Sequence, residues 1–345
     1  DKKGENIRYL SGFTGSSGVC LLTQDVKILM TDFRYDLQAR QESAGWDIRI
    51  KRDYSMSDLI KKYRPRRLGV IGGEISFTRV NRLRKAFPKI KFVDLPNIIK
   101  EMRAVKSPEE IIAIRAAVKM MDKVLRELWN MVKPGATTDC ELAEALKIKL
   151  IKLGSDVSFA PIILSGSDSA FIHGDPFKLS RERERGGISP AKRIIQRGDI
   201  VQFDVGCWVD GYASDISRVV IAGKATAEQK KIHRAVCEAI EAAAVYYKPG
   251  IMAKKAMREA DRTLKRLGFK EGMLHGLGHG IGLEVHELPT TSIDYNFVFH
   301  PGNVISLEPG IYEEGYGGMR IERDVLITGN GPEFLDELTT DLIEL

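Results

Sequence analysis

One pattern occurs twice in this sequence, about one hundred residues apart, and it restricts the possible folds more than any other feature. Each copy contains a helix, a Lys-Pro-Gly turn and a second helix that ends at Leu-Gly. The turns are Lys133-Pro134-Gly135 and Lys248-Pro249-Gly250, and the second helices end at Leu153-Gly154 and Leu267-Gly268. Because self-similarity at a fixed period indicates a repeated structural unit, we predict a duplicated α/β unit with pseudo-twofold symmetry.

The first helix of each copy begins with the same kind of cap. Ser107 precedes a proline and is followed three residues later by Glu110, which is the pattern of a capping box. Thr226 and Gln229 repeat this spacing in the second copy. Apolar residues then follow Ser107 at the intervals of a core-facing helix: Ile111, Ile114, Val118, Met121, Leu125 and Leu128. We therefore predict a long helix after residue 107 and a domain boundary near residue 100.

The first hundred residues follow a different pattern, in which short apolar segments alternate with helical ones. Strands are expected at 19–23, 27–31, 68–71 and 91–93, and helices at 35–43, 56–63 and 77–87. We predict an α/β domain over residues 1–100 and a second domain over residues 101–345.

Composition narrows the class of protein. Hydrophobic residues make up 43% and charged residues 29% of the chain, and no run of about 18 apolar residues occurs, which disfavours both a disordered chain and a membrane span. The four cysteines form no Cys-x-x-Cys pair, which argues against a zinc knuckle or a disulfide framework and favours a reducing cytoplasm. They are Cys20, Cys140, Cys207 and Cys237.

The net charge of +6 raises the question of a nucleic-acid partner. Residues 177–198 contain seven basic and two acidic residues and so supply most of this charge. The same segment contains Gly186, Gly187 and Pro190, which are typical of loops. We interpret it as a long solvated loop, and nucleic-acid binding is not expected.

Two aspartates are predicted to share one face of a hairpin. Ile200–Cys207 alternates in polarity, with Asp204 on the polar face, and Asp210-Gly211 predicts a turn. A turn centred between those two residues sets Asp215 opposite Gly206 and diagonally across from Asp204, about 7 Å apart at the backbone. Two buried like charges at this spacing need a cation or a shared proton.

A second hairpin repeats this arrangement. Strand-like segments flank a turn centred on Gly315, and this symmetry sets Glu308 opposite Glu322. Like charges directly opposite each other destabilise a ladder, so a bound metal explains both carboxylate pairs better than two independent strained pairs. Arg320 shares a face with Glu322, where it could brace a ligand or meet a substrate carboxylate.

Histidines supply the remaining ligand candidates. His275, His279 and His286 lie in a glycine-rich stretch, so a strand or loop is expected there and not the helix of a zinc protease. His173 holds the comparable place in the first half. Four carboxylates and an imidazole form an oxygen-rich set that suits Mn²⁺, Co²⁺, Fe²⁺ or Zn²⁺ in a two-metal site.

Five segments in this order resemble those of the pita-bread metallopeptidases, which include prolidase, aminopeptidase P and methionine aminopeptidase. They are Asp204-Val-Gly, Tyr212-Ala-Ser-Asp215-Ile-Ser-Arg218, His275-Gly-Leu-Gly-His279-Gly-Ile-Gly-Leu-Glu-Val-His286-Glu, Glu308-Pro-Gly-Ile-Tyr312 and Gly318-Met-Arg-Ile-Glu322. Asn6–Phe13 and Thr31–Tyr35 resemble the creatinase-type N-terminal domain, which favours the Xaa-Pro peptidase branch.

The resemblance implies a creatinase-like α/β N-terminal domain followed by a duplicated pita-bread catalytic domain. It also implies a peptidase that cleaves after the first residue of Xaa-Pro peptides and uses two divalent ions per chain, with Mn²⁺ favoured over Co²⁺, Zn²⁺ or Fe²⁺. The implied metal ligands, of which the second and the last bridge the two ions, are Asp204, Asp215, His279, Glu308 and Glu322.

The same resemblance implies the catalytic roles. A hydroxide between the two metals would be the nucleophile, and Glu308 would carry its proton to the leaving amine. His286 and His173 would contact the scissile carbonyl and the tetrahedral intermediate, and Arg320 would support the site.

Three departures from the family pattern carry expectations of their own. The strand and helix that usually precede the Asn6 motif are expected to be missing, and the basic segment 177–198 is longer than usual. Thr290 stands where similar prolidases often place an arginine that helps to bind the terminal carboxylate of the substrate. Strict dipeptide specificity is therefore not expected.

Two other functions are compatible with this fold. One is a creatinase-like or other small-molecule C–N hydrolase, and the other is a non-catalytic binding module. The complete ligand set argues against both, because metal-free enzymes and pseudo-enzymes of this fold usually lose ligands. We also expect a cytoplasmic homodimer without a membrane partner.

Overall fold

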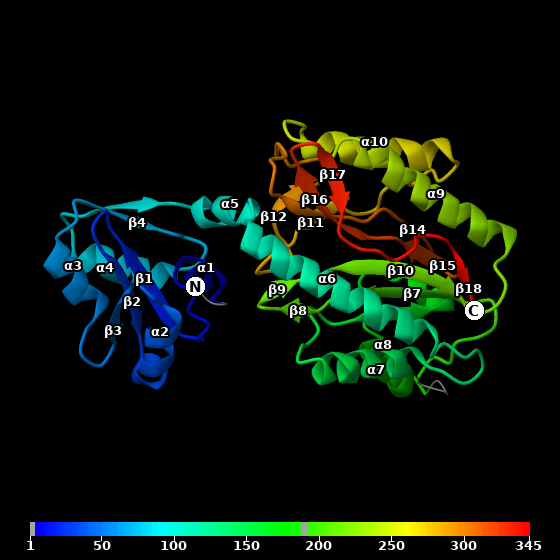
Figure 1. The fold of residues 1–345 in the computed structure, drawn as a ribbon, viewed down its shortest axis with the longest axis horizontal. Coiled ribbons are helices and arrows are strands. Elements are labelled where there is room, and N and C mark those ends of the chain that lie inside the picture. The colour runs from blue at the N-terminus through cyan, green and yellow to red at the C-terminus, as the bar shows by residue number, and fades with distance from the viewer. Residues whose placement is uncertain (1–3, 188–191) are drawn as a thin grey trace. The chain divides into compact units, whose positions relative to one another are not determined.

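The computed structural model describes residues 4–187 and 192–345 (Figure 1). The chain divides into two compact units, residues 1–103 and 104–345. Within the described residues, no helix combines the length and the apolar character needed to cross a membrane.

The N-terminal unit is a small α/β assembly. Strand β1 (Gly18–Leu22) pairs antiparallel with β2 (Lys27–Thr31), which pairs parallel with β3 (Asp47–Ile50). Strands β4 (Arg67–Val70) and β5 (Lys91–Asp94) form a separate parallel pair. The helical elements are α1 (Glu5–Ser11), η1 (Phe33–Tyr35), α2 (Asp36–Glu42), α3 (Met56–Tyr63), α4 (Phe77–Ala86) and α5 (Ile98–Ala104).

The α/β prediction for this unit is confirmed, but α1, β3 and α5 were not predicted. Strand β3 has four half-buried residues, and its alternation of Ile48 and Ile50 with charged neighbours is too short to stand out.

The main helices of the C-terminal unit come in two pairs. The first pair is α6 (Pro108–Trp129) and α7 (Asp139–Lys152), and the second is α9 (Ala227–Ala244) and α10 (Ala253–Arg266). The predicted capping boxes are present at Ser107 and Thr226. In Figure 1 the strands lie between α7 and the pair α9–α10, and two apolar cores line the two helix pairs. The predicted duplication is therefore confirmed.

Two sheets and two hairpins fill the space between these helices. One sheet has the order β18-β10-β7-β6, and its strands are β6 (Ile162–Ser165), β7 (Ile200–Val205), β10 (Ile216–Ile221) and β18 (Ile343–Glu344). The other has the order β12-β11-β13-β16-β17, and its strands are β11 (Gly278–Gly280), β12 (Glu287–Thr291), β13 (Val304–Leu307), β16 (Arg323–Thr328) and β17 (Gly331–Phe334). The hairpins pair β8 (Trp208–Val209) with β9 (Tyr212–Ala213) and β14 (Gly310–Glu313) with β15 (Gly317–Arg320).

The basic segment 177–198 is not the long loop that was predicted. Its first part belongs to helix α8 (Pro176–Arg185), which follows the short η2 helix (Gly166–Ala170). The carboxylate of Asp175 accepts hydrogen bonds from two backbone amides of the first turn of α8. This N-cap, followed by a proline, is a helix-start signal that lies just ahead of the segment. Arg193 forms an ion pair with Asp199 at 3.0 Å, and the part around Pro190 lies outside the described residues.

Candidate metal centre

Asp204 and Asp215 lie on one hairpin in the predicted register. Asp204 on β7 pairs with Ser217 on β10, which places Asp215 diagonally across from it. Gly206, which lies opposite Asp215, is needed for a reason of its own. A Cβ atom at this position would lie 2.0 Å from the Ser214 carbonyl oxygen, so the glycine permits a close backbone approach and does not make room for the carboxylates.

Glu308 and Glu322 lie in an interruption between two ladders. The ladder of β13 with β16 ends at the pair Leu307 and Arg323, and the ladder of β14 with β15 continues beyond the glutamates. Both ladders keep the predicted symmetry about Gly315. The glutamates therefore lie across from each other, as the sequence indicated, but neither belongs to a ladder.

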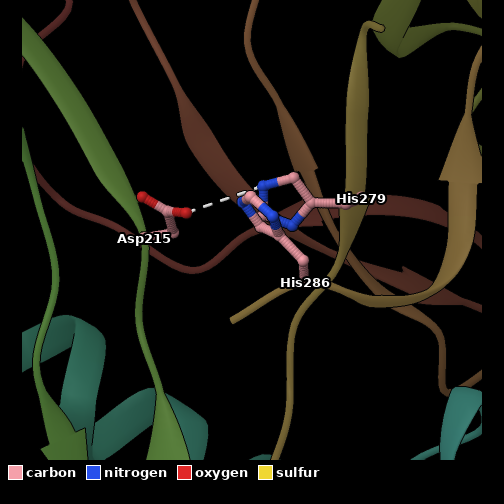
Figure 2. A group of neighbouring side chains, drawn as sticks. All are labelled: Asp215, His279 and His286. Atoms are coloured by element: carbon pink, nitrogen blue, oxygen red, sulfur yellow. Dashed lines mark ion pairs between the residues drawn. The ribbon is translucent and has the colours of Figure 1, made fainter. Parts of the chain in front are cut away.

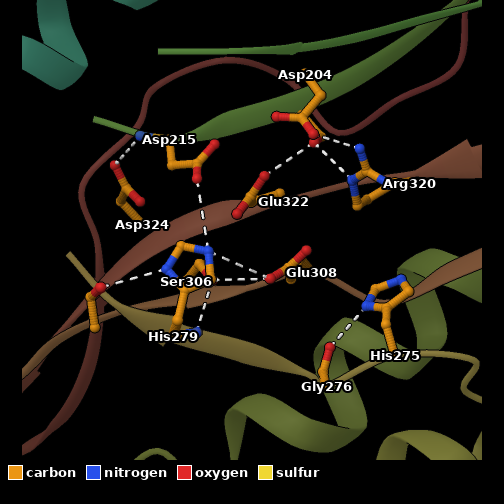
Figure 3. A network of polar contacts seen from close by, with 12 residues as sticks. Asp204, Asp215, His275, Gly276, His279, Ser306, Glu308, Arg320, Glu322 and Asp324 are labelled. Atoms are coloured by element: carbon orange, nitrogen blue, oxygen red, sulfur yellow. Dashed lines mark hydrogen bonds and ion pairs between the residues drawn. The ribbon is translucent and has the colours of Figure 1, made fainter. Parts of the chain in front are cut away.

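His279 lies on β11, and its Nε2 atom faces the carboxylates (Figures 2 and 3). This nitrogen is 3.6 Å from Asp215 Oδ2 and 3.6 Å from Glu308 Oε1. Burial, and next the neighbouring His286, lower the pKa of His279 to about 3, so the ring is neutral. When Nδ1 carries the proton, 3.3 Å from the Gly280 carbonyl oxygen, the Nε2 lone pair is available to bind a metal.

The candidate ligands converge in three overlapping groups. Within each group, one ligand atom from each residue lies within 4.8 Å of the others. The groups are Asp204, Asp215 and Glu322; His279, Glu308 and Glu322; and Asp215, His279 and His286. Asp215 and Glu322 are the two carboxylates that belong to two groups each.

Several carboxylate oxygens of this cluster find no hydrogen-bond partner in residues 4–187 and 192–345. Asp204 Oδ1, Asp215 Oδ1 and Glu322 Oε1 are buried and accept no hydrogen bond from the described residues. Burial, together with the charges of neighbouring carboxylates, raises the pKa of Asp215 and of Glu322 well above the ordinary values. Buried oxygens of this kind are costly unless a cation satisfies them. The residues present therefore fit a divalent metal centre.

Arg320 braces the cluster from one side (Figure 3). Its guanidinium forms an ion pair with Asp204 and donates a hydrogen bond of 2.6 Å to the Tyr312 hydroxyl. It also donates to the Ile172 carbonyl oxygen at 3.3 Å. Burial lowers the pKa of Arg320, but Asp204 and the other anionic neighbours raise it well above its ordinary value. Of the two roles suggested by the sequence, bracing a ligand fits these contacts.

The side chains of His286 and His173 are both exposed. The ring centroid of His286 lies 3.9 Å from that of His279, and Figure 2 shows both rings beside Asp215. His173 directly follows Ile172, the residue whose carbonyl oxygen accepts from the guanidinium described above. The His286 ring is therefore beside the cluster, whereas His173 is connected to it through the backbone of its neighbour Ile172.

Three side chains that hold the ligands were not predicted from the sequence. Ser217 donates a hydrogen bond to Glu322 at 2.9 Å, and Ser306 donates to Glu308 at 3.3 Å. Asp324 accepts a hydrogen bond from the Asp215 backbone nitrogen at 3.2 Å. Each lies two residues from a candidate ligand, so the alternation of a strand could have identified them. His275 was left without a role, and its Nε2 lies 3.0 Å from the Tyr312 hydroxyl.

We expect removal of the metal to destabilise this protein more as the pH rises above about 6.5. Burial raises the pKa of Glu308 to about 7, and the pKa values of Asp215 and Glu322 are also raised. The native metal-free state then binds more protons than the unfolded state, so its free energy of unfolding falls with rising pH. His279, with its lowered pKa, has the opposite effect only below its ordinary pKa of 6.5.

Thermal unfolding of metal-free and Mn²⁺-loaded protein between pH 6.5 and 8.5 would measure this effect. The difference in Tm between the two forms should increase with pH. A constant or shrinking difference would contradict the assignment of these carboxylates to a cation site.

The sequence matches two known families. The metallopeptidase family M24 matches residues 112–329, and the creatinase/prolidase N-terminal domain matches residues 2–105. The Xaa-Pro dipeptidase of Pyrococcus furiosus is 31% identical over 344 residues, which cover 99% of this chain and 93% of that protein.

Solved structures give the same result. The X-Pro aminopeptidase from Thermotoga maritima has a TM-score of 0.87 and 32% identity, over 98% of this chain and 93% of that one. The prolidase from Pyrococcus horikoshii has a TM-score of 0.85 and 31% identity, over 99% and 94% of the two chains.

Fold and site together define a hydrolase that uses divalent metal. More specifically, the chain belongs to the metallopeptidase family M24 and carries the N-terminal domain shared by creatinases and prolidases. The pita-bread architecture implied by the sequence motifs is confirmed.

Proposed function

We propose that this chain is a peptidase that uses two divalent ions to cleave the bond after the first residue of Xaa-Pro peptides. The observation that carries this proposal is the convergence of four carboxylates and His279, in which three buried oxygens have no hydrogen-bond partner among the residues that the structure describes. The activities named for the dipeptidase, aminopeptidase and prolidase relatives support the choice of substrate. We propose Asp215 and Glu322 as the bridging ligands because each belongs to two of the three groups.

The remaining roles follow from position and chemistry. Divalent ions held here would activate water and polarise the scissile carbonyl. Glu308 would take up a proton on its carboxylate and deliver it to the leaving amine. Its side chain is 16% exposed, so solvent and substrate can reach it. The exposed rings of His286 and His173 would orient the substrate carbonyl.

The oxygen-rich ligand set favours Mn²⁺ as the bound metal. A homodimer and a cytoplasmic location are also part of this proposal. The cysteines support no competing thiol mechanism, because burial raises the pKa of the Cys207 and Cys237 thiols to about 11.

A substrate panel tests the proposed function. Mn²⁺-loaded and chelator-treated protein would be assayed on Xaa-Pro, Xaa-Pro-Xaa and Xaa-Ala peptides and on creatine, and elemental analysis would count the metal. Cleavage of the proline peptides that depends on two ions per chain is expected. Hydrolysis of creatine alone, or peptide cleavage by metal-free protein, would reject the proposal.

We expect Xaa-Pro-Xaa peptides to be cleaved at least as well as Xaa-Pro dipeptides. A dipeptide presents its terminal carboxylate close to the metals and needs a cation there, whereas a longer peptide has a neutral amide. Thr290 pairs with His279 across β11 and β12, so its side chain lies on the ligand's face of the sheet and supplies no charge. Arg320 is already engaged by Asp204, and Arg193 by Asp199.

The missing charge-assisted bond costs the dipeptide about 1.5–3 kcal/mol, or roughly 10- to 100-fold in kcat/KM. Thr290→Arg should shift the preference towards dipeptides, and Thr290→Gln, which is also long but uncharged, should not. A wild-type enzyme that strongly prefers dipeptides would contradict this argument.

A further inference from the structure

A buried ion pair joins the start of the C-terminal unit to the strand that follows His286. Lys106 Nζ lies 2.8 Å from Glu287 Oε1, and the two side chains are 0% and 2% exposed. Burying two opposite charges is costly, and removing one of them leaves the other uncompensated in the interior. Substitution of either residue should therefore disturb the surrounding backbone, and the segments next to the pair are the ones affected.

Backbone contacts hold both ends of this pair. The backbone nitrogen of Lys106 donates to the Gly302 carbonyl oxygen at 2.8 Å. Glu287 pairs with Gly280 across β12 and β11, at a point where the register shifts just after His279. The carboxylate of Glu287 is thus held beside the strand that carries a proposed metal ligand.

The same carboxylate also closes the turn at residues 282–286. Its Oε2 atom accepts a hydrogen bond of 3.3 Å from the Glu284 backbone nitrogen. A Cβ atom on Gly282 would lie 2.4 Å from Glu287 Oε1, so glycine is needed there to admit the carboxylate. The turn is also held from outside, because the Gly282 carbonyl oxygen accepts from the Ala213 backbone nitrogen at 2.9 Å.

His286 is the last residue of this turn. Its ring is exposed, yet its centroid lies 3.9 Å from the His279 ring, and one of its nitrogens groups with Asp215 and His279. The ring reaches the cluster from the end of the turn, so a displacement of the turn backbone displaces the ring as well (Figure 2). The next residue in the chain is Glu287, whose buried carboxylate pairs with Lys106.

We propose that Lys106 is a positioning residue that acts through Glu287 to hold the 282–286 turn, and thereby His286, at the reacting centre. This inference rests on the proposed function, because it requires His286 to act on the substrate. Without the ammonium group, the carboxylate would move towards water and draw the turn with it. Displacement of a reacting group by about 1 Å can cost up to about 100-fold in rate.

The test compares Lys106→Met with the double variant Lys106→Met/Glu287→Gln. For Lys106→Met we expect kcat per metal-loaded molecule to fall by about 10- to 100-fold, with KM and metal content near those of the wild type. In the double variant a neutral amide can remain buried and still accept from Glu284, so most of the lost kcat should return. Leu146→Ala, a truncation on the buried side of α7, controls for lower stability and should keep its kcat.

A second measurement does not depend on activity. In the metal-free protein labelled at histidine, the His286 ring signals, assigned with His286→Ala, should move in Lys106→Met and return in the double variant. A Lys106→Met protein with lower Tm but unchanged kcat and unchanged His286 signals would overturn the proposal and leave the pair a purely structural role. If Lys106→Met does not fold, Glu287→Ala replaces it, because this change removes the carboxylate that accepts from Glu284 and pairs with Lys106. Unchanged kcat and unchanged His286 signals in Glu287→Ala would be equally decisive. Wild-type protein that cleaves no Xaa-Pro peptide would instead reject the proposed function, and the histidine signals would still test the positioning.

Discussion

Asp215→Asn and Glu322→Gln are each expected to abolish peptide cleavage, with kcat/KM falling by more than about 100-fold. Loss of residues that merely support metal ligands typically costs about 10- to 100-fold, and loss of a bridging ligand should exceed this range. Each carboxylate contributes a buried oxygen that accepts no hydrogen bond within the described part of the chain. An amide presents one neutral oxygen in place of two charged ones, so it cannot satisfy two cations.

Elemental analysis and turnover, measured on the same preparations, would test this expectation. Asp324→Asn keeps an acceptor for the Asp215 backbone nitrogen and should fall within the smaller range. Glu314→Gln, at the exposed tip of the β14–β15 hairpin, should behave as wild type. Full activity in a preparation without bound metal would refute the two-metal assignment itself.

The carboxylate pairs were predictable because two turns determine the register of their strands. Asp210 and Gly211 both have positive φ, 49° and 73°, which is the geometry of a tight hairpin turn that matches the twist of its strands. Counting outwards from that turn gives Trp208 opposite Ala213, and then Asp204 opposite Ser217. The site of a repeated fold can be read in this way because local turn chemistry determines pairings many residues away.

Other parts of the site depend on contacts that leave no local signal. Nothing near Lys106 in the sequence indicates that its ammonium group meets Glu287, because the pairing depends on how the two segments pack. The link from Arg320 to the Ile172 carbonyl oxygen, next to His173, likewise joins residues almost 150 positions apart. Helix α8 was not predicted for a different reason, since its N-cap Asp175 lies before the basic segment 177–198 and not within it.

The two histidines of the site should respond differently to removal. His279→Ala is expected to lose metal, because a neutral imidazole with Nε2 at 3.6 Å from both Asp215 and Glu308 is placed as a ligand. His286→Ala should keep nearly all its metal and lose about 100- to 1000-fold in kcat, the range found when a donor to a developing oxyanion is removed. Elemental analysis and steady-state kinetics on both variants would measure the two effects separately.

The comparison tests whether His286 is itself a metal ligand, because one of its ring nitrogens also groups with ligand atoms of Asp215 and His279 within 4.8 Å. Exposure separates the two roles. His279 lies on a strand with its side chain 14% exposed, whereas His286 is exposed at the end of a turn, where an incoming substrate can reach it. Removal of a donor that acts mainly in the transition state lowers kcat with little change in KM, whereas removal of a metal ligand lowers the fraction of active enzyme.

His300→Ala, which alters an exposed histidine outside the cluster, should change neither the metal content nor kcat. Equal metal loss in His279→Ala and His286→Ala would show that His286 is a ligand and would move the oxyanion role to His173.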